Sequence, residues 1–255
     1  MLTAVCLAMV FFSVSLRAQQ GEIKLTPAAK IRKGVDAWPL IAGAEDAASK
    51  RVNATLTRLN LTMRQSLKDC DASLLDSFKE EGRKPAGKNP VENDWTRTIE
   101  VTMAGPRFLS LVATDEADCG GAHPNSDTIA MVFDMTTGTP VNWLALVAKG
   151  AGAKAFVDSV IDGTKVGALI LPGLKKINLA AAEKDCREAF LDPQSFQLWP
   201  DAKKGALIAE AFDLPNVVAA CANPFALTAE QARGLGFDAA LLAAIDAAHV
   251  RAAGH

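Results

Sequence analysis

Residues 98–114 read TIEVTMAGPRFLSLVAT, and this stretch decides the fold class of the chain. In its first half, apolar residues alternate with polar ones, which is the period of a strand with one buried face. Gly105-Pro106 marks a turn, and the more fully apolar run from Phe108 to Thr114 predicts a second strand. The stretch therefore predicts an antiparallel hairpin.

A third strand and a helix flank this hairpin. Residues 129–135 predict the strand, after a polar, glycine-bearing loop over residues 115–127. Before the hairpin, five apolar residues recur every three or four positions and form one helical stripe: Val52, Leu56, Leu59, Met63 and Leu67. Residues 80–94 predict a surface loop between helix and hairpin. The helix is thus available to cover one face of the sheet.

The second half of the chain is less regular. Residues 153–161 and 179–190 are predicted as helices, and residues 196–199 and 206–211 as paired strands. Thr228 and Gln231 have the spacing of a capping box, and a last helix is expected from about Asp238. We therefore predict an α+β fold: an antiparallel sheet packed by an amphipathic N-terminal helix, with a second smaller α/β sub-region. Because no long linker interrupts the chain, we expect residues 19–255 to form a single domain.

Composition excludes several classes of protein. Hydrophobic residues make up 49% of the 255 residues and charged residues 22%, which is typical of a globular chain rather than a disordered or fibrous one. The formal net charge is −2. A general nucleic-acid binder needs a basic surplus, so we expect no nucleic-acid partner.

The first 18 residues predict a secretory signal peptide. An apolar run extends from Leu2 to Phe12, and Ala18 is a small residue at the expected cleavage point. No basic residue precedes the run, so either the real start lies elsewhere or the signal is inefficient. No later stretch reaches the roughly 18 uncharged apolar residues of a spanning helix, so we expect no membrane span after cleavage. The mature protein is predicted to be periplasmic or secreted.

The predicted export determines how we interpret the four cysteines that follow the signal peptide. They are an even number in an oxidising compartment, which predicts two disulfide bonds. Their spacing matches no C-x-x-C redox or zinc motif. Three pairings are possible, and we favour Cys70 with Cys119 and Cys186 with Cys221, because each then closes a loop within one half of the chain.

The segment CGGAHPN, residues 119–125, stands out as a candidate binding loop. Paired glycines permit unusual backbone angles, and a proline restricts the residue before it. His123 could act as a base with Asp134, or could bind a metal ion together with nearby acids. The simpler interpretation is that His123 hydrogen-bonds the loop backbone and the acids face water. The candidate binding residues are Gly120, Gly121, His123, Pro124, Asn125 and Asp134, and the candidate acids are Asp115, Glu116, Asp118 and Asp127.

Other motifs are absent or explained more simply. The chain contains no G-x-S-x-G, H-E-x-x-H or P-loop sequence, so we predict no cofactor, no metal site and no catalytic residues of those classes. Asn53 and Asn60 begin sequences that match the glycosylation acceptor, but both lie on the predicted helix, so we interpret them as chance matches. An isolated tryptophan is more often part of the core than an anchor for a partner. We therefore interpret the four tryptophans as core residues: Trp38, Trp95, Trp143 and Trp199.

Several of these segments together resemble a known extracytoplasmic family. The sequence PLIxG at residues 39–43 precedes a helix carrying Val52-Asn53, and the hairpin is followed by GGAHPN, by Phe133-Asp134 and by Thr137-Gly138. This order is similar to the domain shared by the anti-sigma factor RsiV and the peptidoglycan deacetylase PdaC. The resemblance covers residues 38–147 well and later residues only in their pattern of strands. It implies an α+β fold, an extracytoplasmic location and a role facing the cell wall.

The resemblance also implies a function. In RsiV this domain acts as a lysozyme receptor, whereas the sigma-binding segment of RsiV and the catalytic domain of PdaC have no counterpart that we recognise here. We therefore expect an exported, soluble, non-catalytic binding domain that recognises lysozyme or another cell-wall-associated protein or glycan. The alternatives are a small envelope hydrolase or metal-dependent enzyme centred on His123 and Asp134, and a structural envelope protein.

Overall fold

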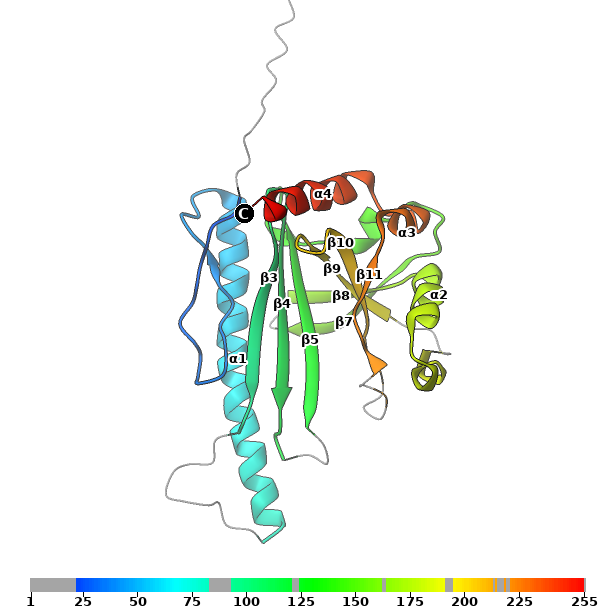
Figure 1. Ribbon diagram of the computed structural model, residues 1–255. Helices are drawn as coiled ribbons and strands as arrows, with labels where there is room; N and C mark the ends of the chain where they lie inside the picture. Colours follow the sequence, from blue (N-terminus) through cyan, green and yellow to red (C-terminus); the bar gives the residue numbers. More distant parts are fainter. Residues whose placement is uncertain are drawn as a thin grey trace, which may run out of the picture.

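The protein is seen here in a computed structural model that describes residues 22–82, 93–120, 124–161, 164–190, 195–212, 214, 218 and 221–254. A long helix lies along one side of a four-stranded sheet, and a second sheet lies on the other side of that sheet (Figure 1). This arrangement confirms the predicted α+β fold. The predicted signal peptide lies outside the described residues.

The first sheet is antiparallel, and its hydrogen-bonded strand order follows the sequence. Its strands are β3 (Thr96–Ala104), β4 (Phe108–Ala117), β5 (Asn125–Asp134) and β6 (Thr139–Pro140). Residues that alternate along β4 enter different cores: Leu109 and Leu111 face the long helix, whereas Phe108 and Val112 face the second sheet. Burial on both faces explains why this part of the sequence is nearly continuous in apolar residues.

The predicted hairpin is confirmed, with one irregularity in β3. The register with β4 shifts between Val101 and Met103. As a result Met103 belongs to the core between the two sheets, while Ile99 and Val101 pack toward the long helix. A bulge of this kind reverses the face on which the following residues lie. The alternation of the sequence therefore does not place all three residues on one face.

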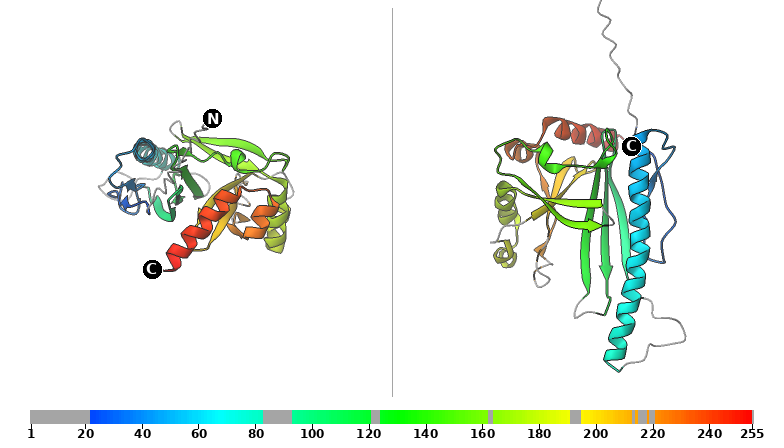
Figure 2. Two further views of the ribbon diagram at one scale, coloured as in Figure 1. Left: turned by 90° about the horizontal axis from the view of Figure 1, so that it is seen from above. Right: turned by 180° about the vertical axis from the view of Figure 1, so that it is seen from behind.

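The long helix is α1 (Ala47–Glu80). Asp46 caps its N-terminus by accepting hydrogen bonds from the backbone N–H groups of Ala48 and Ser49, both 2.9 Å. The predicted apolar stripe is buried, as expected, and packs on the sheet and on the N-terminal segment. The helix extends beyond the stripe, and Figures 1 and 2 show its C-terminal part running past the ends of the strands.

The second sheet is also antiparallel, with strand order β11-β10-β9-β8-β7. The strands are β7 (Lys154–Ile161), β8 (Thr164–Ile170), β9 (Ser195–Asp201), β10 (Ala206–Phe212) and β11 (Phe225–Leu227). The predicted pairing of residues 196–199 with 206–211 is confirmed, for example by Trp199 opposite Ile208. The capping box of Thr228 begins α3 (Ala229–Gly234), and Asp238 caps α4 (Ala239–Ala253), both as predicted.

A glutamine side chain joins the two sheets. Gln197 on β9 donates through Nε2 to the carbonyl oxygen of Thr128 at 2.7 Å and accepts at Oε1 from the N–H of Ala130 at 3.1 Å. Both backbone groups belong to β5. The amide thus satisfies donor and acceptor groups of β5 that would otherwise be unpaired between the sheets.

Two helix predictions in the second half need correction. Residues 153–161 form a strand rather than a helix, because residues 154–161 pair with residues 164–170. Asp162-Gly163, a dipeptide favoured in tight hairpin turns, stands between the two segments in the sequence and indicates this pairing. The other helix is α2 (Pro172–Ala181), followed by short 3₁₀ turns η2 (Lys184–Cys186) and η3 (Glu188–Phe190). Its first residue is a proline, which is favoured there because that position needs no N–H donor.

Both predicted disulfide bonds are present. Cys70 on α1 is bonded to Cys119, just after β4, and Cys186 is bonded to Cys221. The first bond ties the long helix to the first sheet, and the second ties η2 to the segment before β11.

The N-terminal segment covers the outer edge of β3. It contains β1 (Leu25–Thr26) paired with β2 (Leu40–Ile41). Arg97 on β3 donates its backbone N–H to the carbonyl of Gly34 at 2.9 Å, and its carbonyl accepts from Asp36 at 3.1 Å. This pairing protects an edge strand that would otherwise be exposed.

No helix in the described ranges is both long enough and apolar enough to cross a membrane.

Candidate functional site

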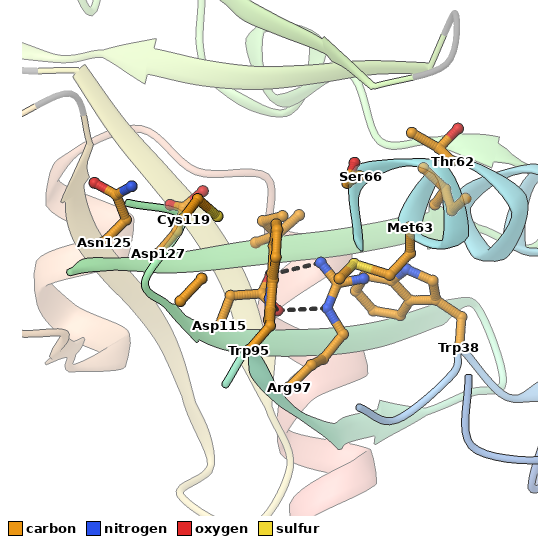
Figure 3. A pocket seen from close by; sticks show the side chains of 13 residues that line it. Trp38, Thr62, Met63, Ser66, Trp95, Arg97, Asp115, Cys119, Asn125 and Asp127 are labelled. Atoms are coloured by element: carbon orange, nitrogen blue, oxygen red, sulfur yellow. Dashed lines mark hydrogen bonds and ion pairs between the residues drawn. The ribbon is translucent and has the colours of Figure 1, made fainter. Parts of the chain in front are cut away.

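A cavity of about 390 Å³ lies between α1 and the helix-facing side of the first sheet, beside Cys119 (Figure 3). Its apolar wall includes Trp38, Leu59, Met63, Trp95 and Ile129. Its polar groups come from α1 and from three strands, and they are Thr62, Ser66, Arg97, Asp115, Asn125 and Asp127. An apolar pocket with a few convergent polar groups is the usual form of a ligand site.

Strand register explains why charged residues meet in this cavity. Arg97 on β3 lies directly opposite Asp115 on β4, and Asp115 lies directly opposite Asp127 on β5. Residues that are directly opposite in neighbouring strands project from the same face of the sheet. The three side chains therefore form one row across the sheet.

Arg97 and Asp115, two members of this row, form a buried ion pair. The guanidinium donates from Nε to Oδ1 at 2.7 Å and from one terminal nitrogen to Oδ2 at 2.5 Å, and each side chain is only 6% exposed. The indole N–H of Trp95 donates to the same Oδ1 at 3.0 Å. The guanidinium carbon also lies 5.8 Å from the ring centre of Trp38. The positive charge of Arg97 is thus balanced within the protein by Asp115.

Asp127 also lines the cavity. It is an exposed residue, so it lies at the mouth. Partial desolvation and the neighbouring charge of Asp115 raise the pKa of this carboxyl above its ordinary value, while a backbone hydrogen bond from Thr128 and the charge of Arg97 oppose that rise. Asp127 forms no ion pair with any other residue that the structure describes.

Two asparagines on α1 hold the segment that carries Trp38. Asn60 accepts from the N–H of Trp38 at 2.8 Å and donates to its carbonyl at 3.1 Å. Asn53, seven residues earlier, makes the same pair of hydrogen bonds with Ile41, at 2.8 and 3.0 Å. Because both amides are engaged in the fold, their match to the glycosylation pattern has a structural explanation.

The predicted binding loop lies next to the cavity, although only part of it is described. Gly121 and His123 lie outside the described residues. Gly120 has a φ of +84°, and a Cβ there would lie 3.0 Å from Cβ of Ser77, so glycine allows the chain to approach α1 closely. Asn125 lines the cavity, and Pro124 immediately precedes it.

Asp134, the last predicted site residue, lies elsewhere. It ends β5, whereas Asn125 begins it, and a strand of this length separates its ends by roughly 30 Å. Its carboxylate accepts from the N–H and the hydroxyl of Thr136, at 2.8 and 2.7 Å. Asp134 therefore shapes the turn after β5 and is not brought to the end of the strand where Pro124 and Asn125 lie. A partnership with His123, which lies outside the described residues, stays untested.

The predicted acidic loop also needs correction. Residues 115–117 belong to β4 and residues 125–127 to β5, so both ends of the expected loop are strand. Asp115 is buried rather than solvated, and Asp118 accepts from the N–H of Gly120 at 2.9 Å. Among the residues with a described position, no three His, Cys, Asp or Glu side chains gather in a way that could hold a metal ion.

Sequence reasoning did not place Thr62, Ser66, Trp95 or Arg97 in a site. Two signals were available, one for Arg97 and one for Thr62 and Ser66. Arg97 precedes Ile99 by two residues, so it lies on the same face of β3. Thr62 and Ser66 are four residues apart on one side of the apolar helical stripe, so they lie on the same face of α1. Neither signal shows which strand lies opposite.

Among the comparisons with known proteins, only the comparison with solved structures yields a match. No protein-family model matches the sequence, and no curated protein matches it. The fold is similar to the crystal structure of a DUF3298 family member from Bacteroides fragilis, with a TM-score of 0.52 and 9% sequence identity. The match covers 88% of this chain and 95% of that one. At this identity the likeness concerns the fold alone: this chain has an α+β fold of the kind found in a DUF3298 family member.

Proposed function

We propose that this chain is an extracytoplasmic binding domain that recognises lysozyme or another cell-wall-associated protein or glycan. The observation that carries the proposal is the cavity between α1 and the first sheet. It combines an apolar wall, including two tryptophans, with a small number of polar groups at its base and mouth. Tryptophan is enriched among the residues that dominate binding energy at interfaces.

The frame around the cavity supports this role because it is held in place before any ligand binds. The bond from Cys70 to Cys119 ties α1 to the end of β4, and Asn60 fixes the backbone of Trp38. A preformed site loses less conformational entropy on binding than a flexible one. Two disulfide bonds also agree with an oxidising, extracytoplasmic compartment.

The family resemblance supports the choice of partner. DUF3298 is the family of the RsiV- and PdaC-like domain that the sequence resembles, and that resemblance implies lysozyme recognition. Several residues of the shared pattern act as scaffold here: Asn53 holds Ile41, and Gly138, with a φ of +71°, lets a turn approach Ala48 of α1. We therefore look for the contact surface in the cavity rather than in the shared pattern.

The test is calorimetric titration of the mature protein with a panel of lysozymes and wall fragments, with muramidase activity followed in parallel. We expect binding in the micromolar range or tighter. Trp95→Ala should weaken it at least tenfold, about 1.4 kcal/mol, because it removes half of the tryptophan wall. Val250→Ala is the control, since Val250 is 72% exposed on α4, away from the cavity.

Circular dichroism of both variants checks that they are folded. No heat and no inhibition with any lysozyme or wall fragment would refute the proposal. Equal affinity of folded Trp95→Ala and wild type would show that binding, if present, uses another surface.

A further inference from the structure

We infer that the cavity beside Cys119 receives one amino group carried on an apolar stem, the chemistry of a lysine side chain on a protein partner. This inference deepens the proposed binding function and rests on it for the source of the ligand. It follows from the charge balance of the cavity, from the distribution of its apolar and polar groups, and from its size.

The charge balance leaves one negative charge unpaired. Arg97, Asp115 and Asp127 are the charged residues among those described in the lining. Arg97 and Asp115 form an ion pair with two hydrogen bonds, so their charges balance each other. Asp127 is left at the mouth with no ion-pair partner among the described residues. A ligand with a single positive charge complements this arrangement.

The cavity lining also supplies hydrogen-bond acceptors for such a charge. An ammonium group has three N–H donors and no acceptor. Besides the carboxylate of Asp127, the lining offers the hydroxyl groups of Thr62 and Ser66 and the amide oxygen of Asn125. Figure 3 shows Asn125 and Asp127 on the sheet side of the cavity and Thr62 and Ser66 on the helix side.

The remaining wall fits a hydrocarbon stem. Met63, Trp95 and Ile129 provide apolar surface next to these polar groups. The volume of about 390 Å³ lies near the lower end of the roughly 300–1,000 Å³ of typical ligand sites. This size suits one side chain better than an oligosaccharide. Desolvation and the charge of Asp115 raise the pKa of Asp127, and a cation bound next to this carboxylate would oppose that rise.

A small probe tests the site independently of any protein partner. We would titrate isotope-labelled mature protein with Nα-acetyl-lysine N-methylamide and follow the indole N–H signal of Trp95, assigned with Trp95→Phe. Nα-acetyl-norleucine N-methylamide has the same stem without the amino group. We expect a saturable shift with the lysine derivative and at least tenfold weaker binding of the norleucine derivative.

Two variants test whether Asp127 supplies the negative charge that binds the amino group of the lysine derivative. Asp127→Asn should remove the preference for the lysine derivative, because it removes the unpaired charge while keeping the size of the side chain. Glu100→Gln is the matched control: it also removes one negative charge from the first sheet, but Glu100 is exposed and pairs with Lys203. The preference should persist in that variant.

Three outcomes would overturn the inference: no saturable shift with the lysine derivative, equal binding of the two derivatives, or an unchanged preference in Asp127→Asn. A shift caused by N-acetylglucosamine and insensitive to Asp127→Asn would assign the cavity to a glycan instead. Lysozyme titration of the same variants separates the two proposals. Lysozyme binding without a probe response refutes only this inference, whereas a probe response without binding of lysozyme or any wall component refutes only the proposed function.

Discussion

The ion pair of Arg97 and Asp115 contributes to the stability of the fold and also lines the cavity. The pair is almost fully buried and is completed by the indole N–H of Trp95. Asp115→Ala would leave the guanidinium of Arg97 buried without a counter-ion, so we expect the free energy of unfolding to fall by about 3–5 kcal/mol. Urea denaturation measures this change. Asp127→Asn, on an exposed acid of the next strand, should change stability by less than about 1 kcal/mol, and a similar loss in both variants would contradict our account.

Glu210 is a second residue whose environment has a measurable consequence. It lies on β10 opposite Gln197 and is 6% exposed. Burial raises the pKa of its carboxyl from 4.5 to about 7, with a smaller contribution from Asp127 in the same direction and an opposing hydrogen bond from Thr128. Between those two pH values the folded state holds the proton more tightly than the unfolded state. Stability from this group is therefore present below pH 4.5 and is lost as pH rises toward 7.

Glu210→Gln removes this dependence on pH. We expect the variant to be more stable than wild type at pH 8, by at most about 3 kcal/mol, and most of this gain to be absent at pH 5. Urea denaturation at the two pH values tests the prediction. The same difference in stability at both values would show that the effect comes from packing rather than from ionisation.

At the scale of elements, the contact of α1 with the segment before it depends on two asparagines. Asn53 and Asn60 each satisfy one backbone N–H and one carbonyl, at Ile41 and Trp38 respectively. Replacing either with alanine should lower the free energy of unfolding by about 1–3 kcal/mol, because backbone groups at the contact lose their partners.

The two variants should differ in their effect on binding. Asn60→Ala releases Trp38, which lines the cavity, so we expect it to weaken binding of the lysine derivative severalfold. Asn53→Ala acts on Ile41, outside the cavity lining, and serves as the matched control for stability. Thermal denaturation and titration of both variants test this, and equal loss of affinity would mean that Trp38 is not held by Asn60 in the way described.

At the scale of the whole molecule, removing each disulfide bond in turn separates its effect on stability from its effect on binding. The bonds link residues separated by 49 and 35 positions, so the chain-entropy model assigns each about 4 kcal/mol of stabilisation. The double variants Cys70→Ser/Cys119→Ser and Cys186→Ser/Cys221→Ser should therefore be destabilised to a similar degree. Only the first should also lose affinity at the cavity, because Cys119 lines it. Loss of affinity in both, measured where both are folded, would contradict a local role for the first bond.

Short-range patterns in the sequence are sufficient for much of this architecture. The apolar stripe of α1, the hairpin of β3 and β4, the pairing of β9 with β10 and the capping box of Thr228 depend on residues close together in the chain. The disulfide pairing is predicted for a similar reason, since each bond closes a loop within one half of the chain. Two helix predictions fail. Residues 154–161 form a strand, because their partner strand rather than their own periodicity determines their conformation, and the helix expected at residues 179–190 is instead Pro172–Ala181.

The candidate site depends on tertiary structure. Arg97, Asp115 and Asp127 come together through the register of three strands, whereas the length of β5 places Asp134 at the opposite end of that strand from Asn125. The acidic residues near the glycine loop look like a solvated cluster in the sequence, yet one is a buried counter-ion and another stands at the mouth of a cavity. A sequence specifies which residues are charged and which face of an element they occupy. Which charges meet, and which one stays unpaired, is decided only when strands and helix pack against each other.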